Sequence, residues 1–223
     1  MLLTISDIPD EFRTGKTDAE NIASLAYGVH RTIPTNTELA GDEGGLRLVQ
    51  AGLRFSSSEI GREMARSSVD LGRCWGKSPQ LVEFAGGLLA ATAMVASVDL
   101  SAAALHRLYR LGPVNPSDPS READVQCFPN EGSLPDPARA WLQETRAAPE
   151  WEVLKGVRDY LVHRHFPIHT TVLPGGSPPF AQQLEIAGER RSVDTFLNDG
   201  KSFAIDRLVT VGLVMLGTAP LGA

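Results

Sequence analysis

Residues 84–98 read FAGGLLAATAMVASV, the longest uncharged run of the chain, and they are bracketed by Glu83 and Asp99. Ser78 and Pro79 precede the run as an N-cap and a first-turn proline, which predicts one long helix from residue 78 to residue 109 or 110. This helix is apolar on nearly every side, so other elements must cover it. The run is shorter than the roughly 18 to 20 residues that a membrane span needs. We therefore expect the central helix of an all-α bundle and no membrane segment.

The composition limits the function. The chain has 223 residues and a formal net charge of -6, with a sequence pI near 5.4. A protein of this charge does not coat nucleic acid non-specifically, so any RNA contact requires a local basic patch. The two cysteines, Cys74 and Cys127, form no CxxC pair, which favours a reducing compartment. The N-terminus lacks the basic and apolar regions of a signal peptide, and we expect a cytoplasmic protein.

Two more helices are predicted before the central one. Thr17 and Glu20 form a capping box, and apolar residues follow at helical spacing, which predicts a helix over residues 18–32. A longer helix is expected from near Glu43 to about Arg73. Its apolar seam is predicted from residues three, four or seven apart. The seam comprises Leu46, Val49, Leu53, Ile60, Met64 and Leu71.

Residues 111–135 are rich in Pro, Ser, Asp and Gly and lack periodicity, so they predict a long surface loop. Asp136 as N-cap, followed by Pro137, predicts a short helix to about Thr145. Pro149 starts the next helix, whose core face is predicted at Trp151, Leu154, Val157 and Leu161. Pro167 disfavours helical geometry at the residue before it, so this helix should end at or before Phe166.

The C-terminal part predicts a small β-hairpin and a last helix. Residues 169–173 (HTTVL) and 182–187 (QQLEIA) have the composition of two short strands, with PGGSPPFA between them. The last helix is expected from Ser192 or Asp194 to about Leu216. The prediction is a single all-α domain over 1–223, a bundle of four to six helices with its core at about 43–217, decorated by a hairpin at 169–187.

The residues best suited to chemistry lie at 158–169, which read RDYLVHRHFPIH. Arg158 and His163 are separated by four residues, Asp159 follows the arginine directly, and Pro167 closes the segment. Guanidinium groups bind phosphate, and imidazoles gain and lose protons near pH 7. No other stretch gathers so many groups of these two kinds.

This arrangement resembles the HEPN superfamily of helical-bundle proteins. Its members carry an arginine, four to six residues and a histidine on a late helix, usually with a polar residue directly after the arginine. Arg158, Asp159 and His163 match that motif, with His165 as the alternative histidine. The resemblance covers residues 43–217 in outline. It implies a homodimeric, metal-independent endoribonuclease of the toxin or antiviral-defence type, without a cofactor and with an antitoxin or regulatory protein as a possible partner.

The resemblance also assigns roles to the matching residues. Arg158 would bind the phosphate, and His163 would transfer protons, with two copies sharing the acid and base roles across a dimer. Helical geometry leaves the histidine open, because His165 lies on nearly the same side as Arg158, whereas His163 lies about 140° around the axis. Asp159 and His165 would support the catalytic pair. Further candidates for binding the RNA substrate are Arg164, Tyr160 and Lys155.

The residues of this segment also have structural interpretations that do not involve catalysis, and a metal site is a further alternative. Arg158 and Asp159 also suit a solvated helix face, and His163 and His165 suit a helix C-terminus, where positive charge is favoured. The chain would then be a bundle that has kept the fold and serves as a binding or assembly module. Metal binding by His163, His165 and His169 is disfavoured, because Pro167 spoils their one-face spacing and no carboxylate or cysteine completes the set. We expect no metal.

Overall fold

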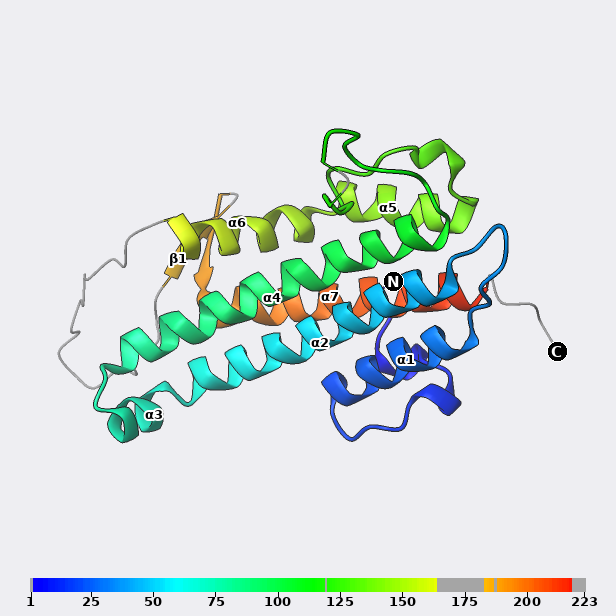
Figure 1. Cartoon of the computed structure of the whole chain (residues 1–223). Helices are drawn as coiled ribbons and strands as arrows, with labels where there is room; N and C mark the ends of the chain where they lie inside the picture. The colour runs from blue at the N-terminus through cyan, green and yellow to red at the C-terminus, as the bar shows by residue number, and fades with distance from the viewer. Residues whose placement is uncertain (1, 119, 164–182, 187, 218–223) are drawn as a thin grey trace. The chain divides into compact units, whose positions relative to one another are not determined.

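The structure is a computed structural model that describes residues 2–118, 120–163, 183–186 and 188–217. The described residues contain seven α-helices and one two-stranded sheet, so the chain is all-α as predicted (Figure 1). The α-helices are α1 Asp18–Thr32, α2 Gly41–Arg66, α3 Ser68–Trp75, α4 Pro79–Leu108, α5 Asp136–Ala147, α6 Pro149–His163 and α7 Val193–Leu216. Short 3-10 helices occur at Ile5–Asp7, Asp10–Phe12 and Glu131–Ser133.

Contacts divide the chain into two compact units. The first comprises Met1–Ser56, Ala96–Ala148 and Ser202–Ala223, and the second comprises Ser57–Val95 and Pro149–Lys201. Helices α2, α4 and α7 each contribute residues to both. The predicted catalytic residues belong to the second unit.

The predicted helix starts at Thr17 and Ser78 are confirmed. The backbone N–H of Glu20 donates to Thr17 Oγ1 at 3.2 Å, and Glu20 Oε2 accepts from the Thr17 N–H at 2.9 Å, which completes the capping box. Ser78 Oγ accepts from the backbone N–H of Leu81 at 3.2 Å at the start of α4. Helix α4 is long and apolar enough to cross a membrane, and 67% of its most apolar window is buried within the structure. This burial agrees with the predicted central helix.

The helix predicted over 43–73 is interrupted at Ser67. Its first part ends at Arg66, and Ser67, with φ -87° and ψ 13°, stands between α2 and α3. These angles depart from the helical values and turn the chain. The backbone N–H of Ser67 still donates to the Glu63 carbonyl at 2.8 Å, and the Leu71 N–H donates to the Ser67 carbonyl at 3.0 Å, so the interruption is confined to one residue. The described helices therefore number seven, one more than the upper limit we predicted.

The apolar seam predicted for α2 is wrong in its main positions. Leu46, Leu53 and Ile60 are 51%, 58% and 65% exposed, whereas Leu48 and Phe55 are buried. The buried side of α2 is rich in glycine, which a hydropathy pattern does not register as a packing surface. Leucines at seven-residue spacing are consequently left on the outer side.

The glycines bring α2 close to its neighbours. In the first unit, a Cβ placed on Gly45 would lie 2.5 Å from Nδ1 of His30 in α1. In the second unit, a Cβ on Gly61 would lie 2.6 Å from the backbone nitrogen of Ala90 in α4. Contacts this short leave no room for a side chain, so glycine is required where the helices meet.

The predicted loop at 111–135 contains one short 3-10 helix, Glu131–Ser133, among its described residues. The helix after it begins one residue earlier than predicted: Pro135, not Asp136, is the N-cap of α5. Asp136 instead lies in the first turn, where its carboxylate is favoured by the helix dipole.

The strand predicted at 182–187 is confirmed as β1 Gln183–Ile186. Its described partner is β2 Glu189–Ser192, in antiparallel register with Gln183 opposite Ser192 and Ile186 opposite Glu189. Gly188, at φ 81°, supplies the left-handed conformation that a tight hairpin turn needs. The other predicted strand, 169–173, lies outside the described residues. The described hairpin therefore leads directly into α7 and does not end at residue 187.

Candidate functional site

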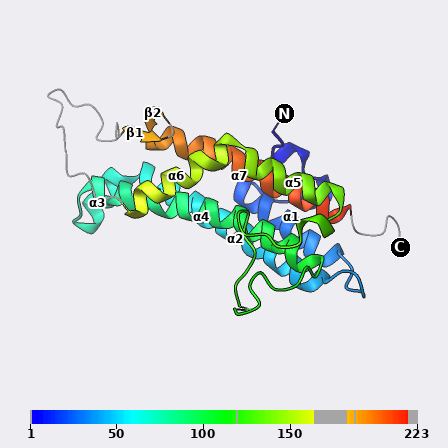
Figure 2. The ribbon, with the colours of Figure 1, turned by 90° about the horizontal axis from the view of Figure 1, so that it is seen from above.

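Helix α6 carries the motif and is anchored in the core of the second unit. Trp151, Leu154, Val157 and Leu161 are all buried, as their spacing predicted. A Cβ on Gly200 of α7 would lie 2.8 Å from Leu154 Cδ1, so α6 and α7 pack closely. Figures 1 and 2 both show α6 beside α4 and α7 within this unit. The buried residues fix which side of α6 faces outward.

The structure brings Arg158 and Asp159 together. Nε and Nη2 of Arg158 lie 2.8 Å and 2.7 Å from Oδ1 of Asp159. The side chains are 31% and 52% exposed, respectively, so both remain accessible to solvent. An ion pair of this kind contributes about 0–1 kcal/mol. A phosphate could therefore replace Asp159 as the partner of Arg158 at little cost.

His163 is the last residue of α6. It follows Asp159 by four residues, so the two positions occupy the same side of the helix one turn apart. The His163 side chain, and the whole of Arg164, His165 and His169, lie outside the described residues. The choice between His163 and His165 as the partner of Arg158 therefore stays a prediction.

The substrate-binding candidates on α6 that the structure describes, Lys155 and Tyr160, are partly covered. Lys155 Nζ lies 2.7 Å from Glu152 Oε1 and 5.5 Å from the ring centroid of Trp151. These contacts hold the ammonium against its own helix. Tyr160 is half-buried. Trp151 is 1% exposed, so it packs in the core and does not offer a stacking surface to a base.

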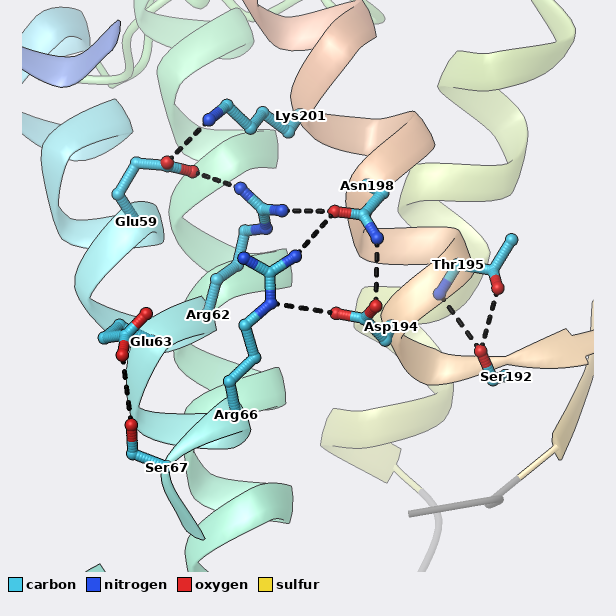
Figure 3. A network of polar contacts seen from close by, with 10 residues as sticks. All are labelled: Glu59, Arg62, Glu63, Arg66, Ser67, Ser192, Asp194, Thr195, Asn198 and Lys201. Carbon is cyan, nitrogen blue, oxygen red and sulfur yellow. Dashed lines mark hydrogen bonds and ion pairs between the residues drawn. The ribbon is translucent and has the colours of Figure 1, made fainter. Parts of the chain in front are cut away.

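Figure 3 shows a polar network between α2 and α7 in the second unit that the sequence analysis did not identify. Arg62 is 5% exposed and donates to Glu59 Oε1 at 2.7 Å and to Asn198 Oδ1. Lys201 Nζ lies 2.8 Å from the other oxygen of Glu59. Arg66 bonds Asn198 at 3.0 Å and Asp194 at 3.3 Å. The residues of α2 and α7 that form this network are about 130 positions apart in the sequence. They come together only in the folded chain, so no local sequence pattern predicts the network.

Basic residues of the hairpin are also engaged. Nη1 of Arg191 lies 2.5 Å from Asp199 Oδ2, and its guanidinium lies 5.2 Å from the ring centroid of Phe196. The Arg190 side chain lies outside the described atoms. The described cations of α2, α6, β2 and α7 in the second unit thus each lie beside an acid, and a phosphate must displace that acid to reach them.

Glu83 is a candidate that sequence reasoning missed. In the sequence, Glu83 stands out only as the charged residue that borders the apolar run. It lies in the second turn of α4, is half-buried, and has no hydrogen-bond or ion-pair partner among the described residues. Burial raises the pKa of its carboxyl to about 7. A carboxyl that titrates near neutrality is a candidate acid or base.

The first unit holds an apolar cavity of about 420 Å³. None of the predicted site residues lines it. The lining residues are Leu3, Tyr109, Pro135, Pro137, Ala138, Thr210, Leu213, Val214 and Gly217. The Tyr109 hydroxyl is buried without a hydrogen-bond partner in the described part of the chain, and burial raises its pKa to about 12. The phenol is therefore neutral and takes no part in proton transfer near neutral pH.

Among the described residues, no group of three or more His, Cys, Asp or Glu side chains could hold a metal ion. The described part of α6 presents an arginine–carboxylate pair followed by a helix end. That arrangement can hold an anion.

No protein-family model matches the chain, and neither a curated protein nor a solved structure matches it significantly. The structure itself defines the class of the protein: it is all-α, with an arginine–aspartate pair near the end of a helix that is anchored in the core. Membership of the HEPN superfamily stays a prediction based on Arg158, Asp159 and His163.

Proposed function

We propose that the protein is a metal-independent endoribonuclease of the toxin or antiviral-defence type, with a HEPN-like fold. One observation carries the proposal: a partly exposed Arg158, held by a displaceable Asp159, lies on a core-anchored helix that ends at His163. Phosphate binding and proton transfer are the two capacities that RNA cleavage by its own 2′-hydroxyl requires.

The reaction needs no external water in its first step. The 2′-oxygen attacks the adjacent phosphorus and loses its proton to a base, the new 2′-O–P bond forms, and the P–O5′ bond breaks. An acid gives a proton to the departing 5′-oxygen. The products are a 2′,3′-cyclic phosphate and a 5′-hydroxyl, and the enzyme returns to its starting state when the base and acid exchange protons with water.

Arg158 meets the negative charge that accumulates on the phosphate oxygens, through the planar fork of its guanidinium. His163 is the base. The Asp159 carboxylate one turn earlier and the negative end of the α6 dipole both favour the positive charge that an imidazole at position 163 acquires. Asp159 thus has two roles: it covers Arg158 before RNA binds and supports His163 during the reaction.

We also propose the setting of this activity. RNA is the substrate, the active form is a homodimer, an antitoxin or regulatory protein restrains it, and the compartment is the cytoplasm. His165 and Arg164 are proposed as supporting and RNA-binding residues. Lys155 and Tyr160 would need to leave their present surroundings to contact RNA.

A second candidate is a non-catalytic binding or assembly module. The pairing of Arg158 with Asp159 and the exposed leucines of α2, Leu46 and Leu53, favour this alternative, because they offer a surface without an assembled site.

One experiment separates the two functions. The purified protein is incubated with RNA in the presence of a chelator, and the products are tested for a cyclic phosphate. Arg158→Ala and His163→Ala should each abolish cleavage while the circular dichroism spectrum is retained. Arg73→Ala, which removes a 78% exposed arginine of the same unit, is the matched control and should cleave normally. RNA that stays intact with the wild-type protein at high concentration supports the binding module instead.

A further inference from the structure

The apolar cavity of the first unit is built from four separate segments of the chain. One wall is a single face at the end of α7, formed by residues at helical spacing: Thr210, Leu213, Val214 and Gly217. The first turn of α5, Tyr109 directly after α4, and Leu3 complete the lining. The volume of about 420 Å³ lies within the range of about 300–1,000 Å³ that small-molecule sites occupy.

Hydrogen bonds hold these segments in place. The indole N–H of Trp141 in α5 donates to the Arg207 carbonyl of α7 at 3.0 Å, about one turn from the cavity on both helices. The Leu3 backbone N–H donates to Oδ1 of Asp206 at 2.6 Å, and Asp206 is 2% exposed. Asp206 lies one turn before Thr210, a lining residue. Since these bonds do not use the lining side chains, the walls of the cavity are formed without a ligand.

The lining of the cavity selects against a charged ligand. Among the described residues it contains no Asp, Glu, Lys, Arg or His side chain. The Thr210 hydroxyl donates to the Asp206 carbonyl at 2.7 Å, and the Tyr109 hydroxyl is buried away from solvent. Neither group can neutralise a charge, and moving an ionised group from water into such a site is costly. The cavity therefore favours an uncharged, mainly apolar molecule.

Exposure and volume limit the ligand further. Leu213 and Val214 are partly exposed and Gly217 is exposed, so a molecule can enter the cavity from solvent at the end of α7. A dry apolar cavity of about 150 Å³ holds one benzene molecule. In proportion, about 420 Å³ has room for a molecule of on the order of 12–16 non-hydrogen atoms.

We propose that this cavity is a binding site for an uncharged, mainly apolar small molecule of that size. All of its lining residues belong to the first unit, whereas Arg158 and Asp159 belong to the second. The inference therefore does not depend on the proposed nuclease function, and either proposal can fail while the other stands.

The test uses two probes of similar shape that differ in charge at about pH 7.5. Biphenyl-4-methanol is neutral, and biphenyl-4-carboxylate is an anion. Isothermal titration calorimetry measures their binding to the full-length protein, and the NMR signals of side-chain methyl groups locate the bound probe. The neutral probe should bind with a Kd of about 100 µM or below, and at least about tenfold more tightly than the anion. The methyl signals of Leu3, Leu213 and Val214 should shift most.

Val214→Phe places a ring in the space that the ligand needs and should weaken binding of the neutral probe by at least about tenfold. Val49→Phe is the matched control, because Val49 is also partly exposed in the first unit but does not line the cavity, and it should bind as the wild type does. Thr210→Leu adds apolar volume at a second point of the same wall and should also weaken binding. Circular dichroism establishes that each variant is folded, so the test does not depend on a single substitution.

Several results would overturn the inference. If neither probe binds saturably, the cavity is not a ligand site. If folded Val214→Phe and Thr210→Leu proteins bind the neutral probe as tightly as the wild type, the probe occupies another place. If the anion binds more tightly than the neutral probe, the ligand class is wrong. If the neutral probe binds only after residues 218–223 are removed, the end of the chain is the occupant in place of a small molecule.

Discussion

The guanidinium of Arg158 is paired with the carboxylate of Asp159, its direct neighbour in the sequence. In the native protein the carboxylate therefore competes with any phosphate for the same donors. Since both side chains are partly exposed, the competition is weak, and it depends on salt because exposed charges are screened.

Asp159→Asn should strengthen RNA binding. The substitution keeps the shape of the side chain and removes the competing charge, so affinity should rise about two- to fivefold at low salt, in line with the strength of an exposed ion pair. Binding of a fluorescent RNA is measured in a His163→Ala background, so that no cleavage interferes. Arg158→Ala in the same background should cancel the gain. A gain that persists without Arg158 would show that Asp159 repels RNA without competing for the guanidinium.

Glu83 should make the protein less stable as the pH rises. Its folded-state pKa is about 7, against an ordinary value of 4.5. Between these values the folded chain keeps a proton that the unfolded chain releases, so the free energy of unfolding falls across this window and is level on either side. Because the carboxyl is only half-buried, solvent screens part of this effect, and the loss should amount to about 1–2 kcal/mol.

Glu83→Gln removes this titration. The variant should gain stability over the wild type as the pH rises from about 4.5 to about 7, and the difference should then stay constant. Urea unfolding at a series of pH values measures it. Parallel stability curves for the two proteins would contradict the raised pKa, whatever the result of the cleavage experiments.

The network around Arg62 should respond asymmetrically to the removal of its partners (Figure 3). Glu59→Gln leaves a buried guanidinium and Lys201 facing a neutral amide, and should cost about 3 kcal/mol. Arg62→Met leaves Glu59 with Lys201 as its partner and fills the space with an apolar chain, so its cost should be about 1 kcal/mol. Urea unfolding of both variants gives their losses of stability, and Glu59→Gln should have the lower unfolding midpoint.

Glu63→Gln is the control for this series. Glu63 is exposed and should change stability by less than about 0.5 kcal/mol. If Arg62→Met proves costlier than Glu59→Gln, the network depends on the arginine's hydrogen bonds and not on the balance of its charges.

Local signals in the sequence predicted the helix starts and the core face of α6, because Thr17, Ser78 and Leu154 act within one turn of the chain. The sequence did not predict the buried side of α2, since Gly61 is recognisable as a packing surface only when α4 lies against it. The candidate site divides in the same way. The Arg158–Asp159 pair is local and could be found from the sequence, whereas the network around Arg62 forms only when α2 and α7 pack together in the folded chain.

Gly61→Ala should test the contact that makes α2 and α4 approach so closely. The added Cβ would lie 2.6 Å from the Ala90 nitrogen and 2.7 Å from the Gly86 oxygen, and both are backbone atoms that cannot turn aside. Alanine favours an isolated helix by about 1 kcal/mol over glycine, so helix propensity alone predicts a gain. Overpacking should outweigh it and leave a net loss of about 1–2 kcal/mol.

Gly132→Ala provides the comparison for the steric effect. No atom lies within 4 Å of a Cβ placed there, and the φ angle of Gly132 is not in the left-handed region, so stability should change little or rise slightly. Thermal unfolding of both variants, followed by circular dichroism, gives the difference directly. A Gly61→Ala protein as stable as the wild type would mean that α2 and α4 can separate without loss.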